Sequence, residues 1–298
     1  MKGIARPVII TAFIVFAAWV AANTAHADTV AYWRFEDGTF GEQMSDPIED
    51  TVGDHDLDVF QGGIYPSYSD SLPAEADPKV PQTGADNTLS AYIMDIGTDN
   101  YLRSDTLGVT SNQVTIEFWV AALSSPGSPS DIFASYSDDA TDTSAMSFYG
   151  GGQHNVTFDL YINSIEYSIT SDTALTQGEW YHIAGTWDNE YMRIYVDGNL
   201  DKQSEILASG SVDLDDAYVG YDPYGNLGGL LRIDEVRISD TALSPDKFLY
   251  SSGGASATPE PGTMVLYGSG MVSMFVSWWR KRRKKRKGVL GKGWMKRS

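Results

Sequence analysis

The sequence predicts an all-β fold built as a two-sheet antiparallel sandwich. The chain of 298 residues contains about a dozen short runs rich in aromatic and β-branched side chains, and Gly, Pro, Asn or Asp separate them, as is typical of strands and turns. Between the two ends of the chain, no long segment repeats apolar residues with the 3.6-residue period of a helix. Because all-β domains of about 200–250 residues commonly form one unit, a single domain is expected.

Residues 178–203 (GEWYHIAGTWDNEYMRIYVDGNLDKQ) carry the clearest pattern. Residues 179–187 are largely apolar or aromatic on both alternating faces, which favours an interior strand. Turn signals follow at residues 188–190 and at Asp197-Gly198, because Asp, Asn and Gly tolerate the left-handed backbone of tight turns. The segment therefore predicts a three-stranded antiparallel meander. The side chains expected to be largely buried in the sandwich are Trp119, Trp180, Ile183, Ile194 and Val196.

The other elements follow from shorter runs. Residues 62–86 contain four Pro and three Gly, which predicts a long surface loop. A brief helix is expected over residues 245–250, with Ser244 as its N-cap and Pro245 at the first helical position. The remaining strands are predicted at residues 30–35, 54–60, 91–96, 100–103, 114–122, 132–136, 146–149, 156–162, 165–169, 217–220 and 230–239.

Four segments in order resemble laminin-G-like, concanavalin A-like jelly-roll domains. Residues 178–203 are similar to the family's GxWYHVAGTYD and LRIYVDG strands. VAYWRFEDG (30–38) resembles its opening strand, and VTIEFWV (114–120) resembles its FTIEAWV strand. LRIDEVRI (231–238), followed by ALSP (242–245), resembles its closing segment. The resemblance implies a jelly-roll sandwich for a domain at residues 28–250.

The N-terminus has the composition of a secretory signal peptide. Lys2 and Arg6 precede an apolar stretch at residues 8–22, and Ala25-His26-Ala27 forms a small-residue cleavage site. Residues 1–27 are therefore predicted to be removed on export. A permanent N-terminal anchor is the less favoured alternative because of the cleavage site.

The C-terminus resembles a PEP-CTERM sorting signal of Gram-negative bacteria over residues 259–287. Pro259, Glu260 and Pro261 form the motif, residues 263–279 are an uncharged transmembrane segment, and residues 280–287 are eight consecutive cations. The resemblance implies recognition by an exosortase-type membrane protease, and a plain membrane anchor is the alternative. Residues 251–258 read as a linker and residues 288–298 as a cytoplasmic extension. The protein is thus expected in the cell envelope, at the cell surface or in the extracellular matrix.

The expected domain is strongly acidic. Residues 28–258 contain eight Lys or Arg and 39 Asp or Glu, so their net charge is about −31. Such a surface repels nucleic acid and other anionic polymers, and it calls for cations to screen it. The chain contains no Cys, which excludes disulfides, thiol catalysis and Cys metal sites.

Catalytic motifs are absent from the sequence. Glycoside hydrolases of this fold use an E-x-D-x-x-E type strand, which does not occur here. Asp234 and Glu235 are adjacent, so a regular strand would direct them to opposite faces and not to a shared catalytic site. His182 lies within the family resemblance and is interpreted as a packing and hydrogen-bonding residue, since no triad-like arrangement surrounds it. The protein is therefore predicted not to be an enzyme.

Calcium is the expected metal. It takes six to eight oxygen ligands, often mixing Asp carboxylates with loop carbonyls. The resemblance implies an ion at the edge of the sandwich, where Asp37 of the opening strand and Asp234 of the closing strand occupy matching positions. The alternative is that Asp234 bonds a turn and Asp37 is solvated.

Glycan binding would require aromatic faces and polar groups in one groove. Five tyrosines lie in predicted Gly- and Pro-rich loops and could stack on sugars: Tyr65, Tyr68, Tyr149, Tyr221 and Tyr224. The sequence is compatible with three functions. The first is a non-catalytic adhesion or glycan-binding module with a polysaccharide partner. The others are a polysaccharide-active hydrolase or lyase with a diverged site, and a structural matrix protein without a ligand.

Overall fold

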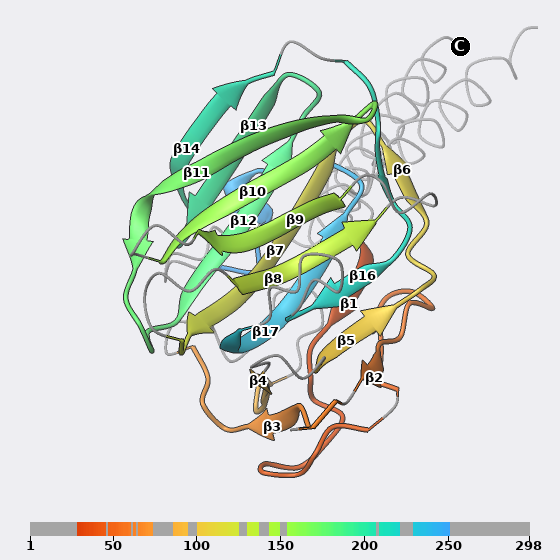
Figure 1. The fold of residues 1–298 in the computed structure, drawn as a ribbon, viewed down its shortest axis with the longest axis vertical. Helices are drawn as coiled ribbons and strands as arrows, with labels where there is room; N and C mark the ends of the chain where they lie inside the picture. The colour runs from red at the N-terminus through yellow and green to blue at the C-terminus, as the bar shows by residue number, and fades with distance from the viewer. Residues whose placement is uncertain are drawn as a thin grey trace, which may run out of the picture. The chain divides into compact units, whose positions relative to one another are not determined.

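The computed structural model describes residues 29–45, 47–60, 62–63, 65–73, 86–94, 100–124, 130–136, 143–149, 154–206, 209–220 and 229–250. In this part of the chain the strands form two large antiparallel sheets and one small sheet. The two large sheets face each other and enclose an apolar core (Figure 1). The predicted two-sheet antiparallel sandwich is therefore confirmed.

The predicted signal peptide, linker, sorting motif, transmembrane segment and cytoplasmic extension lie outside the described residues. Within the described residues, no helix has the length and apolar character needed to cross a membrane.

The first sheet contains eight of the described strands. Its hydrogen-bonded order is β14-β13-β12-β7-β17-β4-β3, and β1 pairs with β17 outside this path. The central strand β7 pairs with β12 on one side and β17 on the other, and all nine of its residues are buried. The strands are β1 (Thr29–Trp33), β3 (Ser67–Ser69), β4 (Ser90–Met94), β7 (Val114–Ala122), β12 (Tyr181–Trp187), β13 (Tyr191–Val196), β14 (Asn199–Glu205) and β17 (Leu230–Ser239).

The second sheet contains seven of the described strands in the order β11-β10-β9-β8-β16-β5-β2. In Figure 1 it lies in front of β7, β12 and β17. Its strands are β2 (Asp58–Phe60), β5 (Tyr101–Ser104), β8 (Ser130–Tyr136), β9 (Thr143–Tyr149), β10 (His154–Ile162), β11 (Ile165–Leu175) and β16 (Ala217–Val219). A separate two-stranded sheet pairs β6 (Val109–Ser111) with β15 (Val212–Leu214).

The predicted meander is present as β12, β13 and β14. Asp188 Oδ1 accepts hydrogen bonds from the main-chain N–H groups of Glu190 and Tyr191, and Asn189 has a φ of 71°. At the second turn, Asp197 and Gly198 both have positive φ values, 47° and 70°. These are the conformations that the Asp and Gly signals predict for a tight hairpin.

Sequence reasoning misses three strands and overstates one helix. β3, β6 and β15 are three residues each, and β3 lies within the predicted long loop. The expected helix over residues 245–250 is a single 3₁₀ turn, η1 (Pro245–Lys247). It is short because the next residues become extended and bond to β7, as described below.

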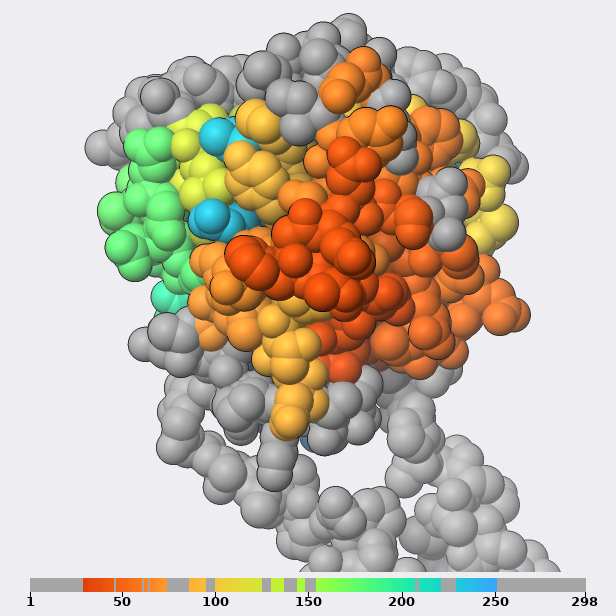
Figure 2. Space-filling model, turned by 90° about the horizontal axis from the view of Figure 1, so that it is seen from below, coloured from red at the N-terminus to blue at the C-terminus, as the bar shows by residue number. Residues whose placement is uncertain are grey.

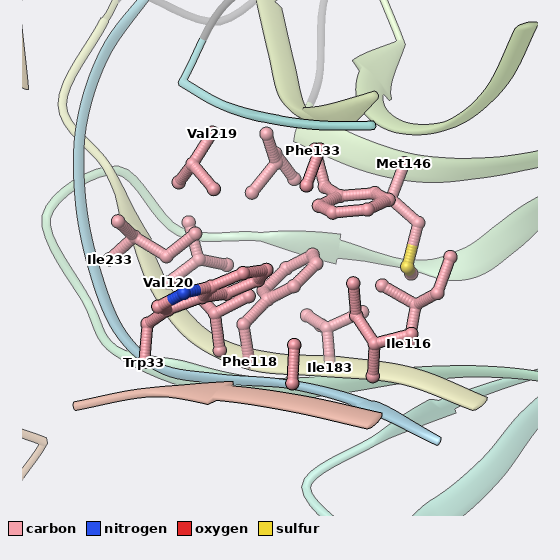
Figure 3. Close-up of a cluster of buried hydrophobic side chains, with 14 of the residues drawn as sticks. Trp33, Ile116, Phe118, Val120, Phe133, Met146, Ile183, Val219 and Ile233 are labelled. Carbon is pink, nitrogen blue, oxygen red and sulfur yellow. The ribbon is translucent and has the colours of Figure 1, made fainter. Parts of the chain in front are cut away.

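The core combines side chains from both sheets. Trp33, Ile116, Phe118, Val120, Ile183 and Ile233 of the first sheet face Phe133, Met146 and Val219 of the second (Figure 3). Burial of each large side chain contributes about 1.5–3 kcal/mol relative to leaving it exposed. Trp119, Ile183, Ile194 and Val196 are buried as predicted. The prediction for Trp180 is wrong: it precedes β12 and is only half-buried, with its indole N–H directed at Ser71 Oγ.

Residues 240–250, here called the C-terminal strap, return across the outer face of the first sheet. One residue of β6 and one residue of β7 hold the start of the strap through hydrogen bonds. Ser111 Oγ donates to Asp240 O, and Thr115 Oγ1 donates to Thr241 O and accepts from Leu243 N. The strap therefore covers a face that would otherwise expose Trp119 and its neighbours.

A buried charge network lies beneath the strap. Glu117 on β7 accepts hydrogen bonds from Arg237 Nε at 2.6 Å and from Leu249 N at 2.8 Å, and its Oε2 lies 2.9 Å from His182 Nε2. Burial alone would raise the pKa of Glu117. The charge of Arg237 and the bond to His182 outweigh burial and hold that pKa below its usual value.

Replacement of Gly198 tests the contact between the strap and the β13–β14 turn. A Cβ at Gly198 would lie 2.7 Å from the Tyr250 ring, whereas a Cβ at Gly41 would meet nothing within 4 Å. Both glycines have left-handed backbones, which cost a non-Gly residue about 1–2 kcal/mol. Gly198→Ala should therefore lower the free energy of unfolding, measured by urea denaturation, by clearly more than the control Gly41→Ala. Equal losses would contradict the packing described here.

Candidate functional site

Two regions of the described chain combine polar groups in a way that could bind a ligand. The first, here called the acidic cluster, contains Glu36, Asn87, Asp234 and Glu235. It forms where the chain leaving β1 and the chain entering β4 meet β17. Figure 2 looks onto an end of the domain where red and orange residues of the N-terminal part of the chain gather.

The backbone at the acidic cluster departs from regular strand geometry. The β17–β7 register shifts between Asp234 and Arg237, and Glu235 has a φ of 52°. Phe35, which follows Arg34 in the opening segment, has a φ of 59°. Non-Gly residues persist in this region only when surrounding contacts hold them there. The bulge breaks the strict alternation expected for Asp234 and Glu235, so that sequence expectation is wrong, and the two carboxylates interact electrostatically.

Each carboxylate of the acidic cluster has defined partners. Tyr32 OH donates to Glu235 Oε2, and Arg34 Nε lies 3.3 Å from Glu235 Oε1. Asn87 Nδ2 donates to Asp234 Oδ2 at 2.8 Å. Glu36 accepts the main-chain N–H groups of Thr88 and Leu89, which fixes the opening segment to the start of β4.

The pKa values of Asp234 and Glu235 are both raised. Burial and the charge of Glu235 raise the pKa of Asp234 well above its usual range. Burial also raises the pKa of Glu235, to about 7, although Tyr32 and Arg34 act in the opposite direction. Asp234 Oδ1 and Asn87 Oδ1 are buried and have no hydrogen-bond partner in the described part of the chain. Unpartnered buried oxygens beside a carboxylate pair suit a cation.

Asp37 lies apart from this arrangement. Its side chain is exposed, and its Oδ2 accepts the N–H of Glu49 at 3.2 Å. The pKa of Asp37 is raised by burial and by the charges of Glu49, Asp56 and Glu36. In the opening segment, the carboxylate whose charge acts on Asp234 is Glu36. No group of three or more His, Asp or Glu side chains placed to hold a metal occurs within the described residues. Any ion at Asp234 would therefore also need main-chain or amide oxygens.

The second region, here called the aromatic platform, lies on the outer face of the second sheet. It contains Phe60, Tyr101, Arg103, Tyr218 and Asp216. The rings of Phe60 and Tyr101 are stacked at 4.7 Å with an interplanar angle of 11°, and both are half-buried. Alternation along β2, β5 and β16 places Val59, Leu102 and Val219 in the core and turns these polar and aromatic neighbours outward.

The polar members of the aromatic platform, Arg103 and Asp216, lie beside its rings. Arg103 Cζ lies 5.3 Å from the centre of the Tyr218 ring, and its Nη2 is 4.0 Å from Asp216 Oδ2. Burial raises the pKa of Asp216 to about 6, with Arg103 acting against it. Phe60 lies on the edge strand β2 and is only half-buried, so part of its surface is exposed beside Tyr101.

The tyrosines suggested by the sequence do not form one group. Tyr65 is 39% exposed. The loop position expected for Tyr68 is wrong, since Tyr68 lies in β3, is 5% exposed and packs its ring on Gly38. Tyr149 ends β9, but its side chain is outside the described part, as are Tyr221 and Tyr224. Pro259, Glu260 and Pro261 also lie outside it. Phe60 and Tyr101 were missed because only the sheet register brings them together.

His182 belongs to the buried network under the strap. Its Nε2 contacts Glu117, and its ring lies between the rings of Trp119, Phe248 and Tyr250. It is fully buried, so it cannot reach a substrate in this structure. This geometry agrees with its interpretation as a packing and hydrogen-bonding residue.

Comparisons with known proteins identify the fold. A laminin G family model, described as the concanavalin A-like lectin/glucanases superfamily, matches residues 96–247, slightly more than half of the 298-residue chain. The mouse "Sushi, von Willebrand factor type A, EGF and pentraxin domain-containing protein 1" is 27% identical over 171 residues, which are 52% of this chain. The match covers only 4% of that much longer protein.

Solved structures with the same fold include toxin binding domains. The binding domain of Paraclostridial Mosquitocidal Protein 1 has a TM-score of 0.54 at 14% identity, covering 73% of this chain and 50% of that chain. The botulinum neurotoxin serotype G binding domain has a TM-score of 0.51 at 14% identity, and the match covers 73% of this chain and 49% of that chain. The botulinum neurotoxin serotype D ligand binding domain, in complex with N-acetylneuraminic acid, has a TM-score of 0.50 at 16% identity. The match covers 74% of this chain and 49% of that chain. This chain thus spans about half of each, and identities this low establish the fold alone.

Proposed function

The chain belongs to the concanavalin A-like lectin/glucanase superfamily, and from this premise we propose that it is an exported, non-catalytic glycan-binding module of the cell surface or extracellular matrix. The aromatic platform carries the proposal. Sugars bind proteins through the flat faces of aromatic rings together with a few polar groups that orient their hydroxyls. Phe60 and Tyr101 supply the rings, and Arg103 and Asp216 supply polar groups beside them.

The choice of a binding module over an enzyme rests on the carboxylates. The paired acids, Asp234 and Glu235, are occupied by Asn87, Tyr32 and Arg34 and are buried. The solved structures with this fold include domains described as binding domains. The superfamily also contains glucanases, so a polysaccharide-active hydrolase or lyase is the competing function. A ligand-free matrix protein is the third.

Substitution of the platform rings tests glycan binding. On a glycan array the full chain should bind a polysaccharide or oligosaccharide without releasing products. Phe60→Ala and Tyr101→Ala should each weaken that binding roughly fivefold or more, which corresponds to about 1 kcal/mol of lost ring contact. If Tyr65→Ala weakens binding as well, Tyr65 belongs to the same binding surface.

Ile165→Ala is the matched control, because Ile165 is a large apolar side chain on the same sheet and is 56% exposed. It should leave binding unchanged. Product release would favour the hydrolase or lyase, and neither binding nor turnover would leave the structural matrix protein.

We also propose that the acidic cluster holds a structural Ca²⁺ ion with Asp234 as its side-chain ligand. The unpartnered Oδ1 atoms of Asp234 and Asn87 and the nearby charge of Glu36 support this choice. Asp37, the other expected ligand, lies in the same opening segment but has its own main-chain partner. The net charge of about −31 over residues 28–258 favours cation binding in general.

Calcium should raise the melting temperature of the wild-type protein at constant ionic strength, and more at pH 8 than at pH 5. The folded-state pKa values of Asp234 and Glu235 are raised. Protonation therefore stabilises the folded state at acidic pH, and this stabilisation falls as the pH rises through about 7. Calcium replaces those protons at higher pH. Asp234→Asn should abolish the rise, and Asp37→Ala tests whether the opening segment contributes. A melting temperature that ignores calcium at both pH values would refute the site.

We further propose that residues 1–27 export the protein and that residues 259–287 act as a PEP-CTERM-type sorting signal read by an exosortase-type membrane protease. Eight consecutive cations at residues 280–287 support this topology, since each costs about 2.5–3.5 kcal/mol at the centre of a membrane helix. The apolar segment before them would stop transfer and leave Pro259, Glu260 and Pro261 just outside the membrane.

Mass spectrometry of the envelope-associated protein from its native host tests the sorting proposal. A mature species that begins at Asp28 and ends near Pro259 is expected. A species that starts at Asp28 and retains the basic tail would instead make the C-terminus a simple membrane anchor.

A further inference from the structure

The strongest contacts of the C-terminal strap lie at its last residues, 247–249. The N–H of Leu249 donates to Glu117 Oε2 at 2.8 Å, and the carbonyl of Leu249 accepts from Trp119 Nε1 at 3.2 Å. Arg237 Nη2 donates to the carbonyl of Lys247 at 2.7 Å. Two of these bonds involve a charged group, and hydrogen bonds of that kind are roughly twice as strong as neutral ones.

Aromatic rings close over the same end of the strap. The Phe248 ring lies 5.1 Å from the Tyr195 ring, and the Tyr250 ring lies 5.7 Å from the Trp119 ring. Both strap rings also flank His182. Leu249 and Phe248 are almost fully buried. The last residues of the strap therefore exclude water from the charged network beneath them.

The contacts near the start of the strap are weaker. Ser111 and Thr115 make neutral hydrogen bonds to residues 240–243. The chain continues for 48 residues beyond Tyr250, so tension applied to that part enters the strap from its Tyr250 end. Peeling would have to begin at Leu249, where a break strands the buried carboxylate of Glu117 without one of its donors.

We propose that residues 247–250 are a strain-relief clamp that keeps tension on the C-terminal part of the chain from reaching β17. The clamp transfers that load through Glu117 and Trp119 to β7, the central strand of the first sheet. Without it, the load would act on Ser239 and separate β17 from β7 one hydrogen bond at a time. The clamp does not depend on glycan binding or on calcium.

Single-molecule pulling on the full chain tests the clamp. The chain has no Cys, so Asp28→Cys with Ser252→Cys supplies two unique attachment points that load the strap from its end. The domain should unfold in one step. Loading through Asp28→Cys with Ser244→Cys bypasses the clamp, because Ser244 is exposed and precedes it, and the domain should then unfold at a lower force. Equal forces at the two attachment points would overturn the proposal.

Two variants weaken the clamp without removing a buried charge. Trp119→Phe deletes the bond to Leu249, and Phe248→Leu deletes the ring contacts. Loaded from position 252, each should show an early extension of up to about 35 Å before the domain unfolds, the length of ten extended residues. Ser111→Ala, which removes a bond at the other end of the strap, should show no such step. An early extension in the wild type, or none in either variant, would refute the clamp.

Discussion

Three strands of the first sheet and the strap meet at one buried carboxylate, Glu117. It lies in the middle of β7 and receives donors from β17, through Arg237, and from the strap, through Leu249, while β12 places His182 against it. Removing one partner from such a buried network typically costs about 3–5 kcal/mol, because the remaining charge stays out of water. Any arrangement of β7, β12, β17 and the strap that separates Glu117 from Arg237 is therefore strongly disfavoured.

The two buried acidic centres of this sheet have opposite electrostatic character. At Glu117, a single guanidinium lies within hydrogen-bond distance and keeps the pKa below its usual value. At Asp234 and Glu235, burial and the charges of neighbouring carboxylates, Glu36 among them, raise both pKa values, and Arg34 lies beside Glu235 alone. At the first centre, both carboxylate oxygens of Glu117 have hydrogen-bond partners, so this centre serves stability. The second has an excess of negative charge and unpartnered oxygens, which is the property expected of a site completed by a proton or a metal ion.

The fold could be predicted from the sequence wherever a strand carries its own pattern. Residues 114–122 and 230–239 were predicted with the same bounds that the structure gives β7 and β17. The turn at Asp197-Gly198 was predictable because its positive φ values need those residue types. The short strands β3 and β6 were not, since their pairing is set by distant segments, β4 and β15. The single 3₁₀ turn also depends on a distant group, because Glu117 binds Leu249 and draws residues 248–250 into an extended course.

The candidate sites were harder to predict for the same physical reason. Asp234 could be proposed from its motif, but the opening-segment carboxylate that acts on it is Glu36 and not Asp37, because the left-handed residue Phe35 redirects the chain before both. Phe60 and Tyr101 are 41 positions apart in the sequence and meet only through the pairing of β2 with β5. Sequence reasoning instead favoured loop tyrosines, and Tyr68 among them packs on Gly38.

The two outer faces of the sandwich differ in how far their aromatic side chains are buried within the described part of the chain. The strap covers Trp119, Ala184 and Tyr195 on the first sheet, so the aromatic side chains there are satisfied by Phe248 and Tyr250. On the second sheet, Phe60 and Tyr101 stack on each other and stay half-exposed. A partly exposed ring pair loses more water on contact with a sugar than an already covered one can. The strap thus covers the rings of the first sheet, whereas the ring pair of the second sheet is partly exposed, and this difference supports the proposed placement of a glycan on the second sheet.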